Sequence, residues 1–485
     1  MGYFLRRAKI GVSVYKSGAI LGVAKGRKSF RDSRSDGLKF DFYSYFNPMK
    51  YFLLCMFILL IQFGCKPSQK TVKQNTVTDV SDSSLVNKSE TNMIKNSTFF
   101  HNLLAQYPGY FDAILKNKEH RVQIVYTKID RGRNGNPKFT DYFYNVNDSA
   151  YFYPASTIKF PVAVLALQKL NELKIAGLNR NTTMVTETAF EKQTAVYNDP
   201  STEDGRPTIE NYIKKILLVS DNDASNRLYE FLGQEYINNT LQSMGYTDIQ
   251  IVHRLDISMT EEQNRNTNPI KFYDANSKVI YEKPAERSNL VYAKRNTKLG
   301  KGFYGGGNLV NEPFDFSVKN RMGIETMHGI MRSIIFPEMV GQKKRFNLTK
   351  DDYAFLHKYM SMFPGESTFP AYDIAGHPDA SVKFMLFGAE KTKQEGDIRI
   401  FSKSGLAYGF LTDITYIIDL KNNIEFMITA TIHCNSDGIY NDDNYDYKTV
   451  GFPFLKNLGK VIYDYELKRD RKIIPDLSKF RFSYK

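Results

Sequence analysis

The sequence predicts an α+β domain with one antiparallel sheet flanked by helices. Strand patterns lie at both ends of the globular part, and helical patterns lie between them. That order is typical of α+β folds, in which strands and helices are segregated along the chain. Of the 485 residues, 42% are hydrophobic and 24% are charged, so the chain has enough apolar side chains to bury a core.

The individual elements follow from periodicity and turn chemistry. We expect helices over 98–118 and 158–173, from the favourable N-cap Thr208 onwards, and over 454–467. We expect strands over 121–129, 138–146, 398–402, 411–420 and 424–433. The first two strands are joined by a Gly/Asn/Pro turn at 132–137 and the last two by a turn at 421–423, which predicts two hairpins.

An apolar run near the N-terminus predicts export. Residues 51–64 are apolar apart from Gln62 and follow Lys50. Fourteen residues are too few to span a bilayer comfortably and match the h-region of a secretory signal. We therefore expect the signal to occupy 49–64, with residues 1–48 either an unusual extension or a wrongly assigned start.

The end of this run resembles a bacterial lipoprotein signal, because Gly64 precedes Cys65. The resemblance implies lipidation of Cys65, with the protein in the periplasm or outer cell envelope. Residues 65–97 are polar and almost free of aromatic residues, which predicts a flexible tether that holds a soluble domain off the membrane. Residues 98–468 are expected to form that domain, and 469–485 a basic tail.

The distribution of charge limits the possible partners, and the number of cysteines limits the possible disulfides. Residues 1–50 contain 11 Lys and Arg against 3 Asp and Glu, so +8 of the net charge of +14 lies outside the predicted domain. The other 435 residues carry +6 without a basic stripe, which argues against nucleic-acid binding. Cys434 is the single cysteine of the globular part, so no disulfide can form within the domain.

Three short motifs occur in order along the domain. They are Ser156-Thr157-Ile158-Lys159, Ser220-Asp221-Asn222 and Lys403-Ser404-Gly405. None is specific alone: residues 13–16 and 16–18 also fit the first and third patterns, but they share Lys16 and precede any Ser-Asp-Asn. A serine at a helix start with a lysine three residues on fits an activated nucleophile, whereas an N-cap serine beside a surface lysine is the simpler structural interpretation.

The ordered set resembles the penicillin-binding proteins and class A β-lactamases over roughly residues 98–468. The resemblance implies an all-α subdomain beside the sheet. Ser220 and Lys403 are 183 residues apart, more than is usual in the family, and the excess lies largely in an insertion at about 265–321. Its Gly-rich stretch, 298–308, lacks the ending of a phosphate-binding loop and predicts a mobile hairpin tip near the site.

The resemblance also implies a role for each motif residue. Ser156 forms the acyl-enzyme and Lys159 acts as its base. Ser220 relays a proton to the leaving nitrogen, and Asn222 holds the substrate amide. Lys403 and Ser404 bind the substrate carboxylate, Gly405 lets the substrate approach the strand, and the backbone N–H groups of Ser156 and Leu406 form an oxyanion hole.

Deacylation is the step at which the sequence departs from the family. Arg254-Leu255-Asp256 resembles the start of the loop that carries the family's water-activating glutamate. Reading on in register, Met259 occupies the glutamate's place, and Glu261 and Glu262 follow. A shift of register makes Glu261 the base; alternatively, both glutamates are solvated loop carboxylates.

We therefore predict a monomeric serine hydrolase that opens β-lactam amide bonds, with no cofactor and no metal, since the seven histidines show no metal-binding spacing. Two alternatives remain open. One is a D-alanyl-D-alanine carboxypeptidase or related envelope hydrolase acting on acyl-D-Ala peptides with slow β-lactam turnover. The other is a non-catalytic envelope lipoprotein that binds such ligands.

Overall fold

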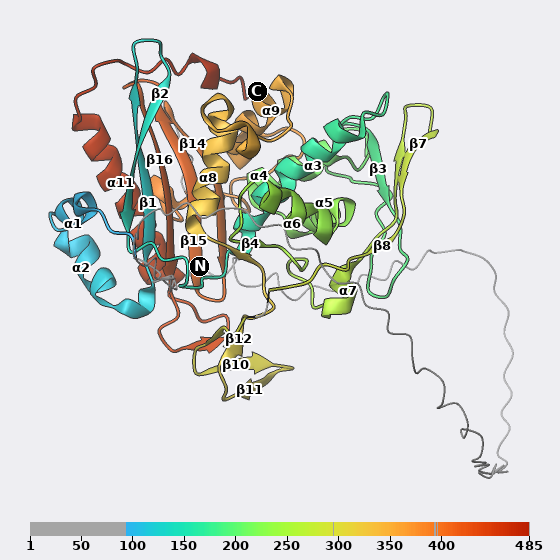
Figure 1. Cartoon of the computed structure of the whole chain (residues 1–485), viewed down its shortest axis with the longest axis horizontal. Helices are drawn as coiled ribbons and strands as arrows, with labels where there is room; N and C mark the ends of the chain where they lie inside the picture. Colours follow the sequence, from blue (N-terminus) through green and yellow to red (C-terminus); the bar gives the residue numbers. More distant parts are fainter. Residues whose placement is uncertain (1–93, 294, 392–393, 395, 485) are drawn as a thin grey trace, which may run out of the picture. The chain divides into compact units, whose positions relative to one another are not determined.

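The computed structural model describes residues 94–484, except for 294, 392–393 and 395. Its main sheet is antiparallel, with five strands in the order β14-β15-β16-β1-β2 (Figure 1). The strands are β1 (Gln123–Arg131), β2 (Pro137–Tyr144), β14 (Ile398–Ala407), β15 (Phe410–Asp419) and β16 (Ile424–His433). The two ends of the domain therefore build one sheet, which confirms the α+β prediction.

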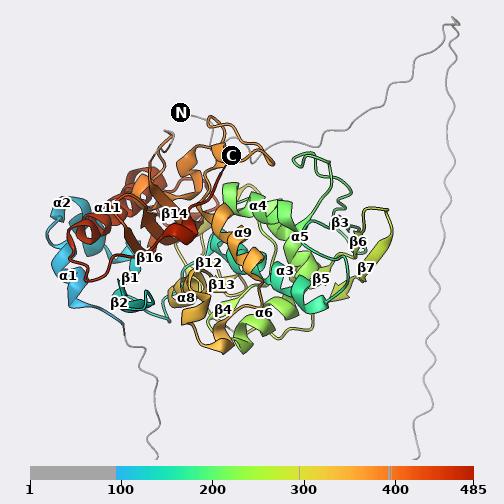
Figure 2. The same cartoon turned by 90° about the horizontal axis from the view of Figure 1, so that it is seen from above.

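Both faces of the sheet are buried, because neighbouring residues of a strand point to opposite sides. Along β15, Ile417 packs in one core, while Tyr416 and Ile418 pack in the other. The first core is covered by α1 (Thr98–Leu104), α2 (Pro108–Lys116) and α11 (Phe452–Lys468). The second is covered by α8 (Ile324–Ile335) and the helical part of the domain, so the sheet lies between two helical layers (Figure 2).

A second, mainly helical part lies beside the sheet, as the family resemblance implied. Its central helix is α3, which is buried along most of its length and is apolar on nearly all sides, as expected for a helix inside a core. The helices are α3 (Lys159–Leu173), α4 (Ile209–Val219), α5 (Asn222–Leu232), α6 (Gln234–Ser243), α7 (Glu261–Arg265) and α9 (Lys350–Ser361).

Short strands fill the connections. One small sheet contains β3 (Thr183–Thr186), β6 (Ile270–Tyr273) and β7 (Val279–Lys283), and another contains β10 (Gly302–Gly305), β11 (Asn308–Val310) and β17 (Ile439–Tyr440). Three strand pairs are β4 (Ile249–Gln250) with β13 (Arg321–Met322), β5 (Asn266–Thr267) with β8 (Glu286–Arg287), and β9 (Lys298–Leu299) with β12 (Phe314–Asp315). A short kinked turn, α10 (Phe384–Phe387), precedes β14.

Two local predictions can be compared directly with this structure. The predicted helix over 98–118 is instead the pair α1 and α2, because Pro108 lacks a backbone N–H and starts a new helix. The predicted Gly-rich hairpin is confirmed as β10–β11, whose turn places Gly306 and Gly307 at φ +58° and +85°. Glycine adopts such angles readily because it has no Cβ.

The insertion is anchored next to the end of β14. Phe314 and Phe316 lie 5.4 and 5.5 Å from the ring of Tyr408, measured between centroids. Tyr153, three residues before Ser156, lies 5.1 Å from the same ring. Aromatic pairs at these separations stabilise each other beyond their buried area. The insertion therefore packs against the segments that carry the first and third motifs.

The predicted extension, signal, lipidated Cys65 and most of the tether lie outside the described residues. Within the described part of the chain, no helix is both long and apolar enough to cross a bilayer. The predicted basic tail packs against the domain: Phe480 is fully buried in the core, and Arg469 forms a 2.5 Å ion pair with Asp130.

Close packing between α11 and α10 gives the first testable prediction. A Cβ at Gly459 would lie 2.6 Å from the backbone nitrogen of Leu386, so Gly459→Ala is expected to lower the free energy of unfolding by about 1–3 kcal/mol through overpacking. The control is Gly109→Ala in α2, where nothing lies within 4 Å. Urea denaturation of both variants measures the difference, and equal stabilities would contradict this packing.

Candidate active site

The fold brings the three sequence motifs together. Ser156 lies in a 3-10 turn, η2 (Ala155–Ile158), that leads into α3. The turn is closed by Thr157, whose backbone N–H and hydroxyl both donate to the Pro154 carbonyl. Ser156 is half-buried, and none of the hydrogen bonds found among the described residues uses its hydroxyl. The Ser156 hydroxyl is thus accessible and uncommitted.

Lys159 is the first residue of α3, and its side chain is completely buried. Its ammonium donates to the Asn222 side-chain oxygen at 2.6 Å, to the Ser220 hydroxyl at 3.3 Å and to the Ser220 carbonyl. A buried amine needs such partners, because an unpaired one would be strongly destabilising. The contacts join the first motif to the second.

The second motif ends one helix and begins the next. Ser220 ends α4 in a left-handed conformation, with φ +59°, and Asp221 caps α5 by accepting the Ala224 backbone N–H at 2.7 Å. This sharp reversal turns the Ser220 hydroxyl toward two amines. Lys403 donates to it at 2.8 Å and Lys159 at 3.3 Å. Ser220 therefore bridges the lysines of the first and third motifs.

The third motif lies directly against η2, the turn that contains Ser156. A Cβ at Gly405 would lie 2.7 Å from the Ser156 nitrogen and 2.8 Å from the Pro154 oxygen. A real side chain does not fit at such distances. Gly405 is therefore needed for the approach of β14 to η2, which is a different reason from the substrate approach that the resemblance implied.

The predicted substrate-binding residues of β14 are placed differently from one another. Lys403 is buried and bonded to Ser220, whereas Leu406 is exposed at the end of the strand. The Ser404 hydroxyl is buried and donates to the Val382 carbonyl at 3.0 Å, on the side of the strand away from Lys403. The structure thus brings Lys403 to the other motifs, while the Ser404 hydroxyl is engaged elsewhere.

A buried ion network holds the loop after β4. Arg254 donates to Glu230 at 2.9 Å and, across the base of the loop, to the Asn268 side chain at 3.3 Å. Asn226 bonds the backbone N–H and carbonyl of Leu255 at 2.9 Å each. Since both residues before it are fixed, Asp256 is held in a left-handed conformation with φ +56°.

Asp256 is the site residue that sequence reasoning missed. Its carboxylate accepts a hydrogen bond from the Asn222 side-chain nitrogen at 3.1 Å, and it is exposed to solvent. The Arg254-Leu255-Asp256 signal was recognised, but counting onward placed the expected carboxylate at Met259. Arg254 bonds across the base of the loop, and this brings the Asp256 carboxylate into contact with Asn222 of the second motif.

Glu261 and Glu262 are not brought into this group. A capping box between Thr260 and Gln263 starts α7. The helix directs Glu261 to Arg265 at 2.8 Å, and Glu262 reaches Arg287 at 2.8 Å. Both carboxylates are about half exposed, and no described hydrogen bond joins Glu261 to the motif residues. The role predicted for Glu261 stays a prediction.

Comparison with known proteins finds a family model that resembles part of the chain. Residues 110–290 match the model of the beta-lactamase enzyme family. The matched segment contains Ser156, Lys159, Ser220, Asn222 and Asp256, while Lys403–Gly405 lie beyond it. No curated protein sequence matches the chain significantly.

Solved structures similar to the chain include several beta-lactamases. A beta-lactamase from Xanthomonas campestris is 13% identical, covers 75% of this chain and 97% of its own, and has a TM-score of 0.42. A class A beta-lactamase from Clostridium kluyveri is 16% identical, covers 74% and 98%, and has a TM-score of 0.39. The protein PBP-A is 14% identical, covers 75% and 95%, and has a TM-score of 0.42.

Burial alters the charges in this candidate site. It lowers the pKa of Lys159 to about 7, although Asp221 and Asp256 partly oppose the shift. Burial also holds the pKa of Lys403 well below its ordinary value, and the neighbouring Lys159 lowers it further. A lysine with a pKa near 7 is partly unprotonated at neutral pH and can accept a proton from a hydroxyl.

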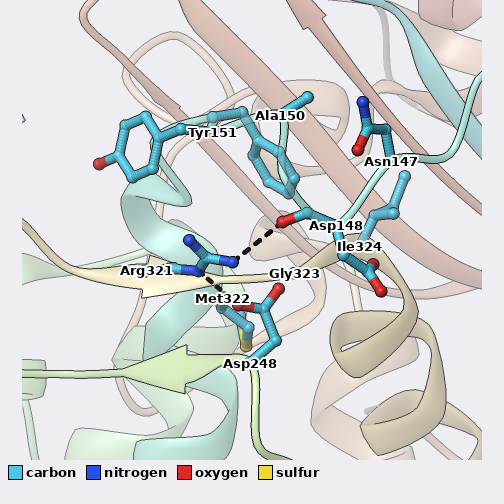
Figure 3. A pocket seen from close by; sticks show the side chains of 10 residues that line it. Asn147, Asp148, Ala150, Tyr151, Asp248, Arg321, Met322, Gly323 and Ile324 are labelled. Atoms are coloured by element: carbon cyan, nitrogen blue, oxygen red, sulfur yellow. Dashed lines mark hydrogen bonds and ion pairs between the residues drawn. The ribbon is translucent and has the colours of Figure 1, made fainter. Parts of the chain in front are cut away.

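A separate pocket lies at the seam between β13 and the segment before η2 (Figure 3). Arg321 forms an ion pair with Asp248 there and donates to the Asp148 carbonyl at 3.0 Å. None of the predicted site residues lines this pocket. Among the described residues, no group of three or more metal-ligating side chains is found.

The contact between β14 and η2 can be tested with Gly405→Ala. The added methyl group would overlap the Ser156 and Pro154 backbone, so we expect the free energy of unfolding to fall by about 1–3 kcal/mol. Urea denaturation measures the change. Gly341→Ala is the matched control, because a Cβ there meets nothing within 4 Å. If both variants are equally stable, β14 does not approach Ser156 as described.

Proposed function

We propose that this chain is a class A-like serine hydrolase that opens β-lactam amide bonds through an acyl-enzyme on Ser156. The observation that carries the proposal is the buried amine of Lys159, which donates hydrogen bonds to Ser220 and Asn222. Lys159 lies three residues after Ser156, whose hydroxyl takes part in none of the hydrogen bonds found among the described residues. The family match supports the reaction class. The sequence motifs supply the assignment of roles.

In the proposed acylation, Lys159, Ser156 and Ser220 act one after another. Lys159, unprotonated, takes the proton of the Ser156 hydroxyl, and the Ser156 oxygen bonds to the carbonyl carbon of the lactam. The carbonyl electrons shift to oxygen, which we assign to the backbone N–H groups of Ser156 and Leu406. When the C–N bond breaks, the Ser220 hydroxyl gives its proton to the nitrogen and regains one from a neighbouring amine.

Lys403 is suited to bind the carboxylate that β-lactams carry. Its ammonium lies 2.8 Å from the Ser220 hydroxyl, so an anion bound by Lys403 lies next to the proton donor for the leaving nitrogen. Asn222 has one amide hydrogen bond to Asp256 and a second N–H available for a substrate carbonyl. The substrate is therefore held on both sides of the reacting bond.

We assign the activation of water for deacylation to Asp256, in place of Glu261. Asp256 is solvent-exposed and touches Asn222, whereas Glu261 is paired with Arg265. The carboxylate takes a proton from water, the water oxygen attacks the acyl carbon, and the ester bond to Ser156 breaks as Ser156 regains a proton. This step returns the free enzyme.

A peptidase of the D-alanyl-D-alanine carboxypeptidase type is the second candidate. The pairing of Glu261 and Glu262 with arginines favours it, because release from Ser156 is slow toward β-lactams if no carboxylate activates water. Export and lipidation at Cys65 are part of either proposal and rest on the sequence of residues 49–65. A lipid-anchored hydrolase would meet both substrates in the cell envelope.

Intact-mass spectrometry over time tests the acyl-enzyme. Purified full-length chain mixed with a penicillin is expected to gain the mass of the antibiotic and then lose it as hydrolysed product accumulates. Ser156→Ala is the control and should show no adduct, because it lacks the attacking oxygen. An adduct that persists for hours on the wild type favours the carboxypeptidase type, and no adduct at all contradicts the proposal.

Asp256→Asn tests the assignment of the second step. Removing the base should leave adduct formation intact and slow adduct loss by about 100-fold or more, the usual contribution of a general base. The decay of the penicillin adduct measures this rate. Glu261→Gln is the matched control and should decay like the wild type. If Glu261→Gln is the slow variant instead, the base is Glu261.

A further inference from the structure

One lysine of the insertion lies against the aromatic rings at the end of β14. The Lys319 ammonium is 5.5 Å from the ring centre of Phe314 and 5.7 Å from that of Tyr408, distances at which ring faces attract a cation. Lys319 is partly buried, and none of the hydrogen bonds or ion pairs found among the described residues uses its ammonium. The nearest carboxylate in sequence, Asp315, lies opposite Lys298 in the strand register. The charge of Lys319 is therefore held in place but not neutralised.

The residue after Lys319 fixes its backbone. Asn320 is fully buried, its backbone N–H donates to His253 Nε2 at 3.1 Å, and its side-chain nitrogen donates to the His253 carbonyl at 3.1 Å. His253 begins the loop that carries Asp256, and its ring stacks on Tyr153, just before the first motif, at 6.4 Å between centroids. Lys319 thus lies where three segments that carry site residues meet.

The order of residues along β14 sets the direction in which a substrate extends. Lys403 bonds the second motif, Gly405 packs against the Ser156 backbone, and Tyr408 turns the chain into β15 with φ +53°. Because a strand rises about 3.3 Å per residue, Tyr408 lies at most about 10 Å beyond Gly405. A substrate with its carboxylate at Lys403 and its reacting carbonyl at Ser156 would extend its acyl substituent toward Tyr408 and Lys319.

We propose that Lys319 is a specificity-determining residue that selects acyl donors with a second carboxylate, on the acyl side of the bond that is cleaved. The proposal rests on the proposed function, since it concerns the same site. Lys403 takes the carboxylate on the leaving-group side and Lys319 the one on the acyl side, so the favoured substrate is a dianion. The second carboxylate accepts the hydrogen bonds that Lys319 donates to none of the described residues.

The surroundings of Lys319 make the site sensitive to the sign of the ligand's charge. Burial lowers the pKa of Lys319 from its ordinary value, because a partly desolvated ammonium is less stable than a hydrated one. A carboxylate beside the ammonium offsets this cost. A neutral substituent leaves the cost unchanged, and a positively charged substituent adds repulsion to it.

Three penicillins that differ at one carbon test the inference. α-Carboxybenzylpenicillin, benzylpenicillin and α-aminobenzylpenicillin carry a carboxylate, a hydrogen and an ammonium on the same side-chain carbon. The second-order rate of Ser156 acylation is measured for each by intact mass. In Lys319→Met, the ratio of the first rate to the second is expected to fall by about fivefold, the upper range for a partly exposed ion pair.

Reversing the charge gives the opposite expectation. Lys319→Glu should shift the rate ratio toward α-aminobenzylpenicillin and away from α-carboxybenzylpenicillin. Lys298→Met is the matched control, because it removes the same charge from an exposed position of the same insertion, and it should keep the wild-type ratios. Ratios that are equal in the wild type and in both Lys319 variants overturn the inference, even where all three penicillins acylate Ser156.

Calorimetry with Ser156→Ala separates this inference from the proposed function. The variant lacks the attacking oxygen, so it reports binding without acylation. Adding Lys319→Met to it should weaken the binding of α-carboxybenzylpenicillin by about fivefold relative to that of benzylpenicillin. If no penicillin forms an adduct with the wild type, the proposed function fails, and this comparison still decides the inference. Affinities that do not depend on Lys319 overturn it.

Discussion

The Ser220 hydroxyl is shared by two buried amines, and the arrangement of the site depends on this sharing. Lys159 and Lys403 come from α3 and β14, which belong to different layers of the fold. Neither side chain reaches bulk water, so each must satisfy its donors on protein oxygens. A shift of α3 would take the Lys159 amine away from Ser220 and Asn222, and a shift of β14 would take Lys403 away from the Ser220 hydroxyl. The helical part and the sheet are therefore held in a fixed relation at the point where they meet.

The backbone around this point is strained where the side chains must meet. Ala155, Ser220 and Asp256 each have positive φ, at +47°, +59° and +56°. Non-glycine residues in this region carry a cost of order 1–3 kcal/mol each and persist where the surrounding structure determines them. Pro154 closes the turn at Ala155, the α4–α5 reversal fixes Ser220, and the buried pair of Arg254 and Glu230 anchors the residues before Asp256.

Sequence reasoning was most successful where the signal is local. The main strands and α3 follow from periodicity, and the motif residues follow from short spacings that a helix or strand turns into neighbours. Helix 98–118 was wrong as one element, because the effect of Pro108 on the helix was not weighed. The insertion could be located by length but not placed, since its contact with Tyr408 joins residues about 90 positions apart.

The residues that were missed depend on contacts distant in sequence. Asp256 was missed because the expected carboxylate was placed by counting residues along the chain, which led to Met259. The position of Asp256 is instead set by Arg254, which bonds Asn268 across the loop. Lys319 belongs to no motif, and a lysine held over aromatic rings cannot be told from a solvated one by its neighbours in sequence. The role predicted for Gly405 in substrate approach stays a prediction, and the contact of Gly405 with the Ser156 backbone could not be foreseen from the sequence.

The balance of charge supports the anionic substrate of the proposed function. Lys159, Lys403 and Lys383 are fully or almost fully buried, and Asp221 and Asp256 are the carboxylates that partly oppose the lowering of the Lys159 pKa. Asp256 lies at the exposed side, where it bonds Asn222 and remains accessible to water. The buried side thus has an excess of amines, which a substrate carboxylate would neutralise under the proposed function. In the proposed function, Asp256 on the exposed side activates water, so attraction of the substrate and release of the product use opposite charges in separate places.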